Sequence, residues 1–155
     1  MPTSSPNKDK ILTIRHLSVA LPASGDRLYA VQDLNLDIRP GEIVCVVGES
    51  GSGKSVTAQS VMGLLPKGQL SATSGEIFLE GEDLLAASAQ RLRDLRGSRM
   101  AMIFQEPMTA LNPVLTVGAQ IAEVLKIHTA LDDQACRLRV LDMMQAVHLP
   151  DPERM

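Results

Sequence analysis

The 155-residue chain lacks the features that mark several classes of protein. Its only two cysteines, Cys45 and Cys136, lie far apart, in an apolar run and a helical pattern, so we expect buried small hydrophobic residues and no disulfide framework. No stretch approaches the roughly 18 apolar residues that a membrane span requires. The three histidines have no metal-ligand spacing, and we expect structural or solvated roles for His16, His128 and His148.

A strong charge of one sign is also missing. The formal net charge is -3, which gives no support to a nucleic-acid partner. The first ten residues are polar and lack the apolar region of a signal peptide, so we expect a disordered leader over residues 1–10 and a cytoplasmic location. One local basic cluster is expected to be a solvated helix face with intramolecular pairs: Arg91, Arg93, Arg96 and Arg99.

Periodicity predicts a mixture of strands and helices. Strands are expected near residues 11–21, 31–38, 43–47, 76–79 and 99–104, the third and fifth as buried apolar runs. Helices are expected near residues 55–65, 88–95, 117–127 and 132–148. Ser88 can cap the second helix, and Pro66 is expected to end the first because proline cannot continue the hydrogen-bond ladder. Leu138, Leu141 and Met144 recur at helical spacing, which predicts a core-facing stripe.

One segment indicates a particular chemistry. It is the run Gly48-Glu49-Ser50-Gly51-Ser52-Gly53-Lys54-Ser55, which fits the phosphate-loop pattern G-x-x-x-x-G-K-[ST] between a predicted strand and a predicted helix. Its glycines allow backbone N–H groups to close around phosphate oxygens, and the following helix start adds a positive dipole end. We expect Lys54 to reach the β- and γ-phosphates and the Ser55 hydroxyl to ligate Mg²⁺. A flexible Gly/Ser loop is the alternative, disfavoured by the flanking elements.

A second segment narrows the class of protein. It is Met100-Ala101-Met102-Ile103-Phe104-Gln105-Glu106-Pro107-Met108-Thr109-Ala110-Leu111-Asn112-Pro113, which resembles the Q-loop region of ABC transporter ATPases. Within them it is similar to the branch that powers oligopeptide, dipeptide and glutathione uptake. The likeness extends over residues 96–121 and over the loop run 48–58, where Val56 stands at a position that is often valine in this branch. Altogether it covers about residues 11–149.

The resemblance implies an α/β fold of the P-loop NTPase, ABC-ATPase type. It has N-terminal antiparallel strands, a phosphate-loop strand and helix, the Q-loop, and the start of a helical subdomain. The implied division is a core with its antiparallel β-subdomain at 11–113 and an incomplete helical subdomain at 114–155, after the leader. The adenine-stacking aromatic of the family falls near Leu21 by alignment, which puts that contact in doubt. Tyr29, the one tyrosine, is the alternative, beside a role at the strand edge.

The resemblance also implies the site residues and cofactors, ATP and Mg²⁺. Residues 48–56 would bind the nucleotide, Lys54 and Gln105 would be catalytic, and Ser55 and Gln105 would contact the metal. A side-chain amide suits both roles of Gln105, because its oxygen can ligate a hard cation while its N–H orients water.

The implied partners are those of an importer at the inner face of the cell membrane. They are transmembrane permease subunits at the Q-loop region, a second ATP-binding subunit in a head-to-tail dimer, and, indirectly, a solute-binding protein. The implied function is that of an ATP-binding subunit that couples ATP hydrolysis to uptake of peptides or related small solutes.

Several family motifs have no counterpart in the sequence: the L-S-G-G-Q signature, the strand ending in Asp-Glu, and the switch histidine. We therefore expect a truncated product or a fragment that binds ATP and hydrolyses it negligibly by itself. The alternative is a non-catalytic nucleotide-binding or regulatory module that pairs with an intact subunit. Thermal stabilisation by ATP without turnover would favour that module. A small-molecule kinase is a weaker alternative, since no acceptor-site motif is present.

Overall fold

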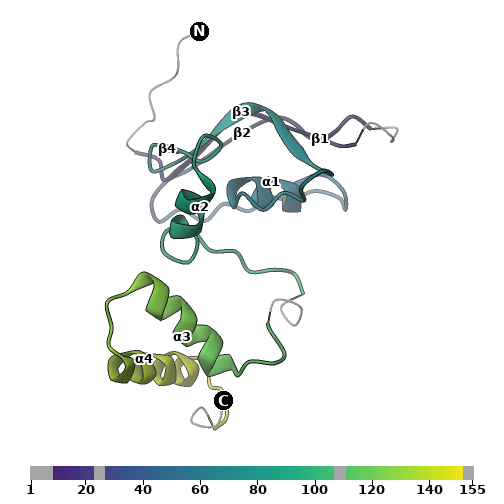
Figure 1. Ribbon diagram of the computed structural model, residues 1–155. Coiled ribbons are helices and arrows are strands. Elements are labelled where there is room, and N and C mark those ends of the chain that lie inside the picture. The colour runs from purple at the N-terminus through teal and green to yellow at the C-terminus, as the bar shows by residue number, and fades with distance from the viewer. Residues whose placement is uncertain (1–8, 23–26, 107–110, 152–155) are drawn as a thin grey trace. The chain divides into compact units, whose positions relative to one another are not determined.

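The computed structural model describes residues 9–22, 27–106 and 111–151, which form two compact units that divide between Arg93 and Asp94 (Figure 1). The elements in chain order are β1 (Leu12–Ala20), β2 (Tyr29–Ile38), α1 (Lys54–Val61), β3 (Ser71–Leu79), β4 (Glu82–Asp83), α2 (Ala89–Leu95), α3 (Val117–His128) and α4 (Asp133–Ala146). The strands and α1 belong to the first unit, and α3 and α4 to the second. The leader expected at the N-terminus lies almost wholly outside the described residues.

The first unit is built on an antiparallel sheet in the order β2-β1-β3-β4. Its core is centred on β1, where the side chains of Ile14, Leu17 and Val19 are fully buried. Ile14 and Leu17 are both buried although an odd spacing of three residues would place them on opposite faces of a regular strand. The register shifts between them, and His16 takes a positive φ of 49°, as an inserted bulge residue does. The strands expected near residues 11–21, 31–38 and 76–79 are confirmed, the last of them longer than predicted.

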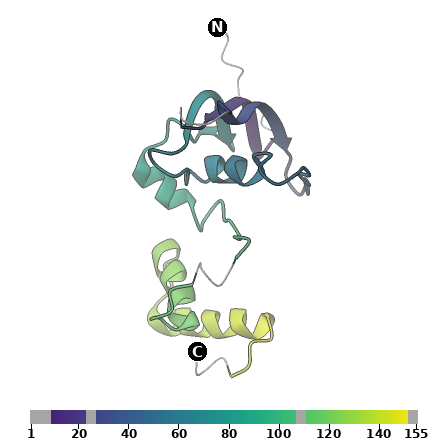
Figure 2. The ribbon, with the colours of Figure 1, turned by 90° about the vertical axis from the view of Figure 1, so that its right-hand side faces the viewer.

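Helix α1 lies beside β2 on one face of this sheet (Figures 1 and 2). It ends at Val61, so the expectation that Pro66 ends it is wrong. Gly63, with a φ of 61°, donates its N–H to the Ser60 carbonyl at 3.1 Å, and the Leu64 N–H donates to the Gln59 carbonyl at 2.8 Å. These two bonds form a Schellman motif, which closes the helix one turn before the proline.

Two segments that the apolar pattern predicts as buried strands, residues 43–47 and 99–104, are not strands in the structure. Ile43 is 97% exposed and Ile103 is 94% exposed. Cys45 is exposed as well, against the expectation of burial. A strand exists only through ladder bonds to a neighbour, and parallel strands are buried on both faces. Among the described residues neither segment has a strand partner, apart from a single bridge at Met100.

Helix α2 is joined to β4 by a charged pair. The Arg91 guanidinium donates to both carboxylate oxygens of Glu82 at 2.7 Å, and Arg93 donates to the Gln90 side chain at 2.6 Å. These contacts confirm intramolecular partners for two arginines of the basic cluster. The Arg91 hydrogen bond also lowers the pKa of Glu82 below its usual value.

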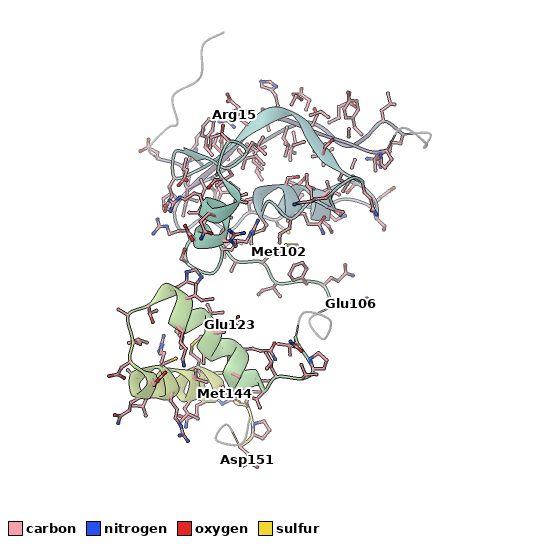
Figure 3. The ribbon with its side chains drawn as sticks, in the orientation of Figure 1. Arg15, Met102, Glu106, Glu123, Met144 and Asp151 are labelled. Carbon is pink, nitrogen blue, oxygen red and sulfur yellow. The ribbon has the colours of Figure 1, made fainter. Side chains whose placement is uncertain are left out.

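The second unit is a pair of packed helices, α3 and α4. The buried side chains of α4 are Cys136, Val140 and Met144, the last of which is labelled in Figure 3; they are spaced four residues apart and therefore share one face. Burial is confirmed for Met144 and Cys136. It is wrong for Leu138, which is 57% exposed, because Leu138 is two residues from both Cys136 and Val140 and therefore lies on the opposite side of α4.

A cluster of three charged side chains joins β1 to β2 in the first unit. Lys10 Nζ lies 2.6 Å from Asp37 Oδ2, and Nη2 of Arg15, which is labelled in Figure 3, lies 2.7 and 2.9 Å from the two Asp37 oxygens. Partial burial raises the pKa of Asp37, but the hydrogen bonds from Lys10 and Arg15 outweigh it. The net effect places the pKa of Asp37 below its usual 3.8.

Because this pKa is lower in the folded state, the cluster stabilises the fold above the unfolded pKa and loses that contribution as pH falls through the folded pKa. We expect Asp37→Asn to lower the free energy of unfolding by roughly 0.5–1 kcal/mol near pH 7, a small effect because the three side chains remain partly solvated. Urea unfolding of both proteins between pH 7 and pH 2.5 measures the difference. It should narrow below about pH 4, and a difference that stays constant would contradict this account.

Candidate functional site

The glycine-rich loop at residues 48–53 leads directly into α1 in the first unit. Gly53, the residue before the helix, has a φ of 94°. A Cβ there would lie 2.5 Å from the Ala30 carbonyl oxygen and 2.9 Å from Val31 Cγ2. The loop backbone therefore packs directly on β2, and glycine is required both for its conformation and for its lack of a side chain.

The start of α1 differs from that of the other helices. Each of the others has a side chain that accepts a hydrogen bond from a first-turn N–H: Ser88 from Arg91 at 3.1 Å, Thr116 from Ala119 at 3.2 Å, and Asp132 from Ala135 at 2.7 Å. Helix α1 has no side-chain cap from the part of the chain that the structure describes, and no acidic residue in its first turn. Its first N–H groups therefore lack a carboxylate or hydroxyl partner from the helix start, and with the positive dipole end they suit an anion.

Lys54 closes over the loop. Its Nζ donates to the carbonyl oxygens of Gly48 and Glu49, both at 2.7 Å, and to Ser52 Oγ at 3.3 Å. These contacts fix the ammonium group beside the helix start. The next residue, Ser55, is exposed, so its hydroxyl can reach a ligand from solvent.

A cleft of about 360 Å³ opens beside the loop, between the start of α1 and β2. It is lined by Arg27, Ala30, Val31, Gln32, Leu34, Leu36, Val46, Val47, Gly48, Ser52, Gly53, Lys54 and Thr57. Among these described residues the ionisable side chains are Arg27 and Lys54, both cationic. The volume and charge of the cleft suit an organic anion such as a nucleotide.

Arg27 is the site residue that sequence reasoning missed. Its Nη1 donates to the Gly51 carbonyl at 2.9 Å, and its Nη2 donates to the Ala30 carbonyl at 3.1 Å. The guanidinium thus joins the loop to the first residues of β2. The motif does not include this position, and the contact arises only when the strand folds beside the loop.

The sequence-predicted site residues fall in both units. Gly48, Glu49, Ser52 and Lys54 come together through hydrogen bonds in the first unit. Gln105 lies in the second unit and is exposed, next to the Glu106 labelled in Figure 3. Its contact with a metal held by Ser55 therefore stays a prediction.

The two residues considered for adenine stacking lie at the paired ends of β1 and β2. Leu21 is half-buried and donates its N–H to the Leu28 carbonyl at 2.9 Å, and Tyr29 is half-buried at the start of β2. Neither of them lines the cleft. An adenine contact by either residue therefore stays a prediction.

Metal coordination and membrane insertion are two further possibilities for the described residues. Within residues 9–22, 27–106 and 111–151, no group of three or more His, Cys, Asp or Glu side chains is arranged to hold a metal ion. None of the helices in these ranges has the length and apolar character needed to cross a bilayer.

Comparison with known proteins places the chain in a family. The family model described as ABC transporter matches residues 31–154, so the chain belongs to the ABC transporter family. It is 44% identical over 144 residues to the dipeptide transport ATP-binding protein DppD of Bacillus subtilis, covering 93% of this chain and 43% of that protein. It is 39% identical to the oligopeptide transport ATP-binding protein OppD of the same organism, covering 94% and 40%.

A third relative transports a different solute by its name. The peptidoglycan transport ATP-binding protein YejF of Agrobacterium fabrum is 45% identical over 148 residues, covering 96% of this chain and 27% of that protein. The chain thus spans less than half the length of each of these three curated relatives. The resemblance to the peptide-uptake branch is confirmed.

Solved structures confirm the fold. The dimeric, post-hydrolysis ATP-binding cassette MJ0796, described as bound to ADP and Pi, matches with a TM-score of 0.76 and 24% identity, covering 90% of this chain and 58% of that one. The structure of cbiO1 from Clostridium perfringens, described as part of an ABC transporter complex, matches with a TM-score of 0.62, covering 88% and 50%. The first unit and the helix pair are therefore parts of an ABC-type cassette fold.

Proposed function

We propose that this chain is, or is part of, the ATP-binding subunit of an ABC importer that couples ATP hydrolysis to the uptake of peptides or related small solutes. The observation that carries the proposal is the loop at residues 48–53, where an uncapped helix start, two cations and a cleft of about 360 Å³ coincide. The names of the chain's relatives, which specify dipeptide and oligopeptide transport, support peptides as the class of solute.

The nucleotide would bind with its phosphates at residues 48–56. Backbone N–H groups at the start of α1 would donate to phosphate oxygens, and Lys54 would exchange its long 3.3 Å contact with Ser52 for one of them. The Ser55 hydroxyl would ligate Mg²⁺. The metal, when bound, neutralises charge that develops on the transferred phosphoryl group.

The remaining roles belong to the second unit and to partners. Gln105 would approach the same metal ion and orient the attacking water, and the Q-loop region around it would contact a transmembrane permease subunit. A second ATP-binding subunit would pair head to tail with this one at the cytoplasmic face of the cell membrane, and a solute-binding protein would act indirectly. We assign residues 11–113 to the nucleotide-binding core and 114–155 to the helical subdomain.

The proposed metal ligand gives a direct test. Binding of a nucleotide to the native state alone raises the free energy of unfolding by about 2.7 kcal/mol at a hundredfold excess over Kd. We expect ATP to raise the melting temperature of the wild-type chain, and Mg²⁺ to enlarge the rise. In Ser55→Ala the rise with ATP in EDTA should persist, while the additional effect of Mg²⁺ should disappear. The role of Ser55 is wrong if Mg²⁺ acts equally on both proteins.

A further inference from the structure

Arg27 occupies a position from which it can act on the phosphate loop and on its ligand together. Its two terminal nitrogens donate to carbonyls that belong to different elements, Gly51 in the loop and Ala30 in β2. Ala30 is also the residue against which Gly53 packs, since a Cβ at Gly53 would lie 2.5 Å from the Ala30 oxygen. One guanidinium therefore joins the loop to the strand residue on which Gly53 packs.

The Arg27 guanidinium has more N–H donors than its contacts with the loop and the strand use. Arginine carries five N–H donors and cannot be deprotonated in a protein. The described contacts of Arg27 use two of them, both to uncharged carbonyls. Because Arg27 is exposed and lines the cleft together with Lys54, the N–H groups that these two carbonyls do not use can donate to a ligand in the cleft.

The charge of the cleft indicates what that ligand is. The chain has a net charge of -3, yet the ionisable side chains among the described residues lining this cleft are both cations. Guanidinium groups match the geometry of phosphate oxygens and form hydrogen bonds with them that are about twice as strong as neutral ones.

We propose that Arg27 is a second phosphate-binding cation of the site: it positions the loop through Gly51 and donates to the phosphate chain of the bound nucleotide. This inference rests on the proposed nucleotide site. It assigns Arg27 to the phosphates and not to the base, although a guanidinium can also stack on an aromatic ring. If Arg27 contacts the phosphates, it must also strengthen the binding of a polyphosphate that carries no base.

Calorimetric titration of the full chain with ATP and, separately, with inorganic tripolyphosphate distinguishes these roles. Loss of one charge-assisted hydrogen bond should weaken both ligands about tenfold in Arg27→Ala. Arg27→Lys keeps the charge but lacks the planar fork that can donate to Gly51, Ala30 and a phosphate together, so we expect it to recover only part of the loss. Arg39→Ala removes an exposed arginine of the same unit outside the cleft and should leave both affinities within twofold.

The outcomes separate this inference from the proposed function. If the wild-type chain binds neither ligand, the nucleotide site itself is wrong. If the wild-type chain binds both and Arg27→Ala binds them equally well, only the role of Arg27 is wrong. Weaker binding of ATP with unchanged binding of tripolyphosphate would overturn the phosphate assignment in favour of a base contact. The melting temperature of Arg27→Ala without ligand should fall only slightly, because the two hydrogen bonds to Gly51 and Ala30 are made by an exposed side chain, and a large decrease would reduce Arg27 to a structural role.

Discussion

Replacing Gly53 with alanine is expected to destabilise the first unit by about 3 kcal/mol and to abolish ATP binding. A positive φ of 94° costs a residue with a Cβ roughly 1–2 kcal/mol. The new methyl group would also lie 2.5 Å from the Ala30 carbonyl oxygen and 2.9 Å from Val31 Cγ2. Relieving that overlap costs about 1–3 kcal/mol, because the nearer atom belongs to the backbone of β2 and cannot rotate away. Urea unfolding of the wild type and of Gly53→Ala measures the decrease in the free energy of unfolding.

Gly41→Ala is a matched control for this substitution. Gly41 also has a positive φ, 72°, but a Cβ there would meet no atom within 4 Å. We expect Gly41→Ala to lower the free energy of unfolding by about 1 kcal/mol, which is the cost of the positive φ without any steric overlap. It should leave nucleotide affinity unchanged. Equal costs for the two substitutions would show that the loop does not pack on β2 as described.

Lys54→Ala is expected to weaken ATP binding by roughly 10- to 100-fold. A hydrogen bond between charged groups contributes about 1.5–3 kcal/mol when it replaces no equivalent contact, and Lys54 is the cation placed beside the start of α1. In the free protein the ammonium donates to the carbonyls of Gly48 and Glu49 at an exposed site, so its removal should change the melting temperature little. The rise in melting temperature of the wild type and of Lys54→Ala over a range of ATP concentrations measures the two affinities.

Lys67→Ala provides the comparison for that prediction. Lys67 is exposed in the turn after α1 and lies outside the residues that line the cleft. The substitution removes the same charge from the same unit and should leave the ATP affinity within about twofold, since Lys67 contributes no group to the cleft and physiological salt screens exposed charges. If the two lysine variants bound ATP alike, the loop would not be the binding site.

Sequence reasoning succeeds where the physical cause is local. The strands near residues 11–21 and 31–38 follow from alternating apolar residues, and the helix start at Ser88 follows from capping chemistry. The phosphate loop can be predicted from the sequence because its glycines are needed for the backbone conformation, as the positive φ of Gly53 demonstrates. Each of these features depends on residues that are close in sequence.

Sequence reasoning fails where the cause is a distant partner. Residues 43–47 and 99–104 carry strand-like apolar runs, but a ladder cannot be inferred from one strand alone, and the described residues provide none. Helix α1 ends early because the Schellman bonds around Gly63 form before Pro66 is reached. Arg27 was missed because its two carbonyl contacts exist only after β2 has folded beside the loop.

The central claim is that residues 48–56 form a nucleotide-phosphate site, and isothermal titration of the wild-type chain with ATP and Mg²⁺ tests it most directly. The account predicts saturable binding with one nucleotide per chain, weakened in Lys54→Ala and retained in Lys67→Ala. The account is contradicted if millimolar ATP produces no saturable heat with a folded chain, or if binding is saturable but indifferent to the loss of Lys54.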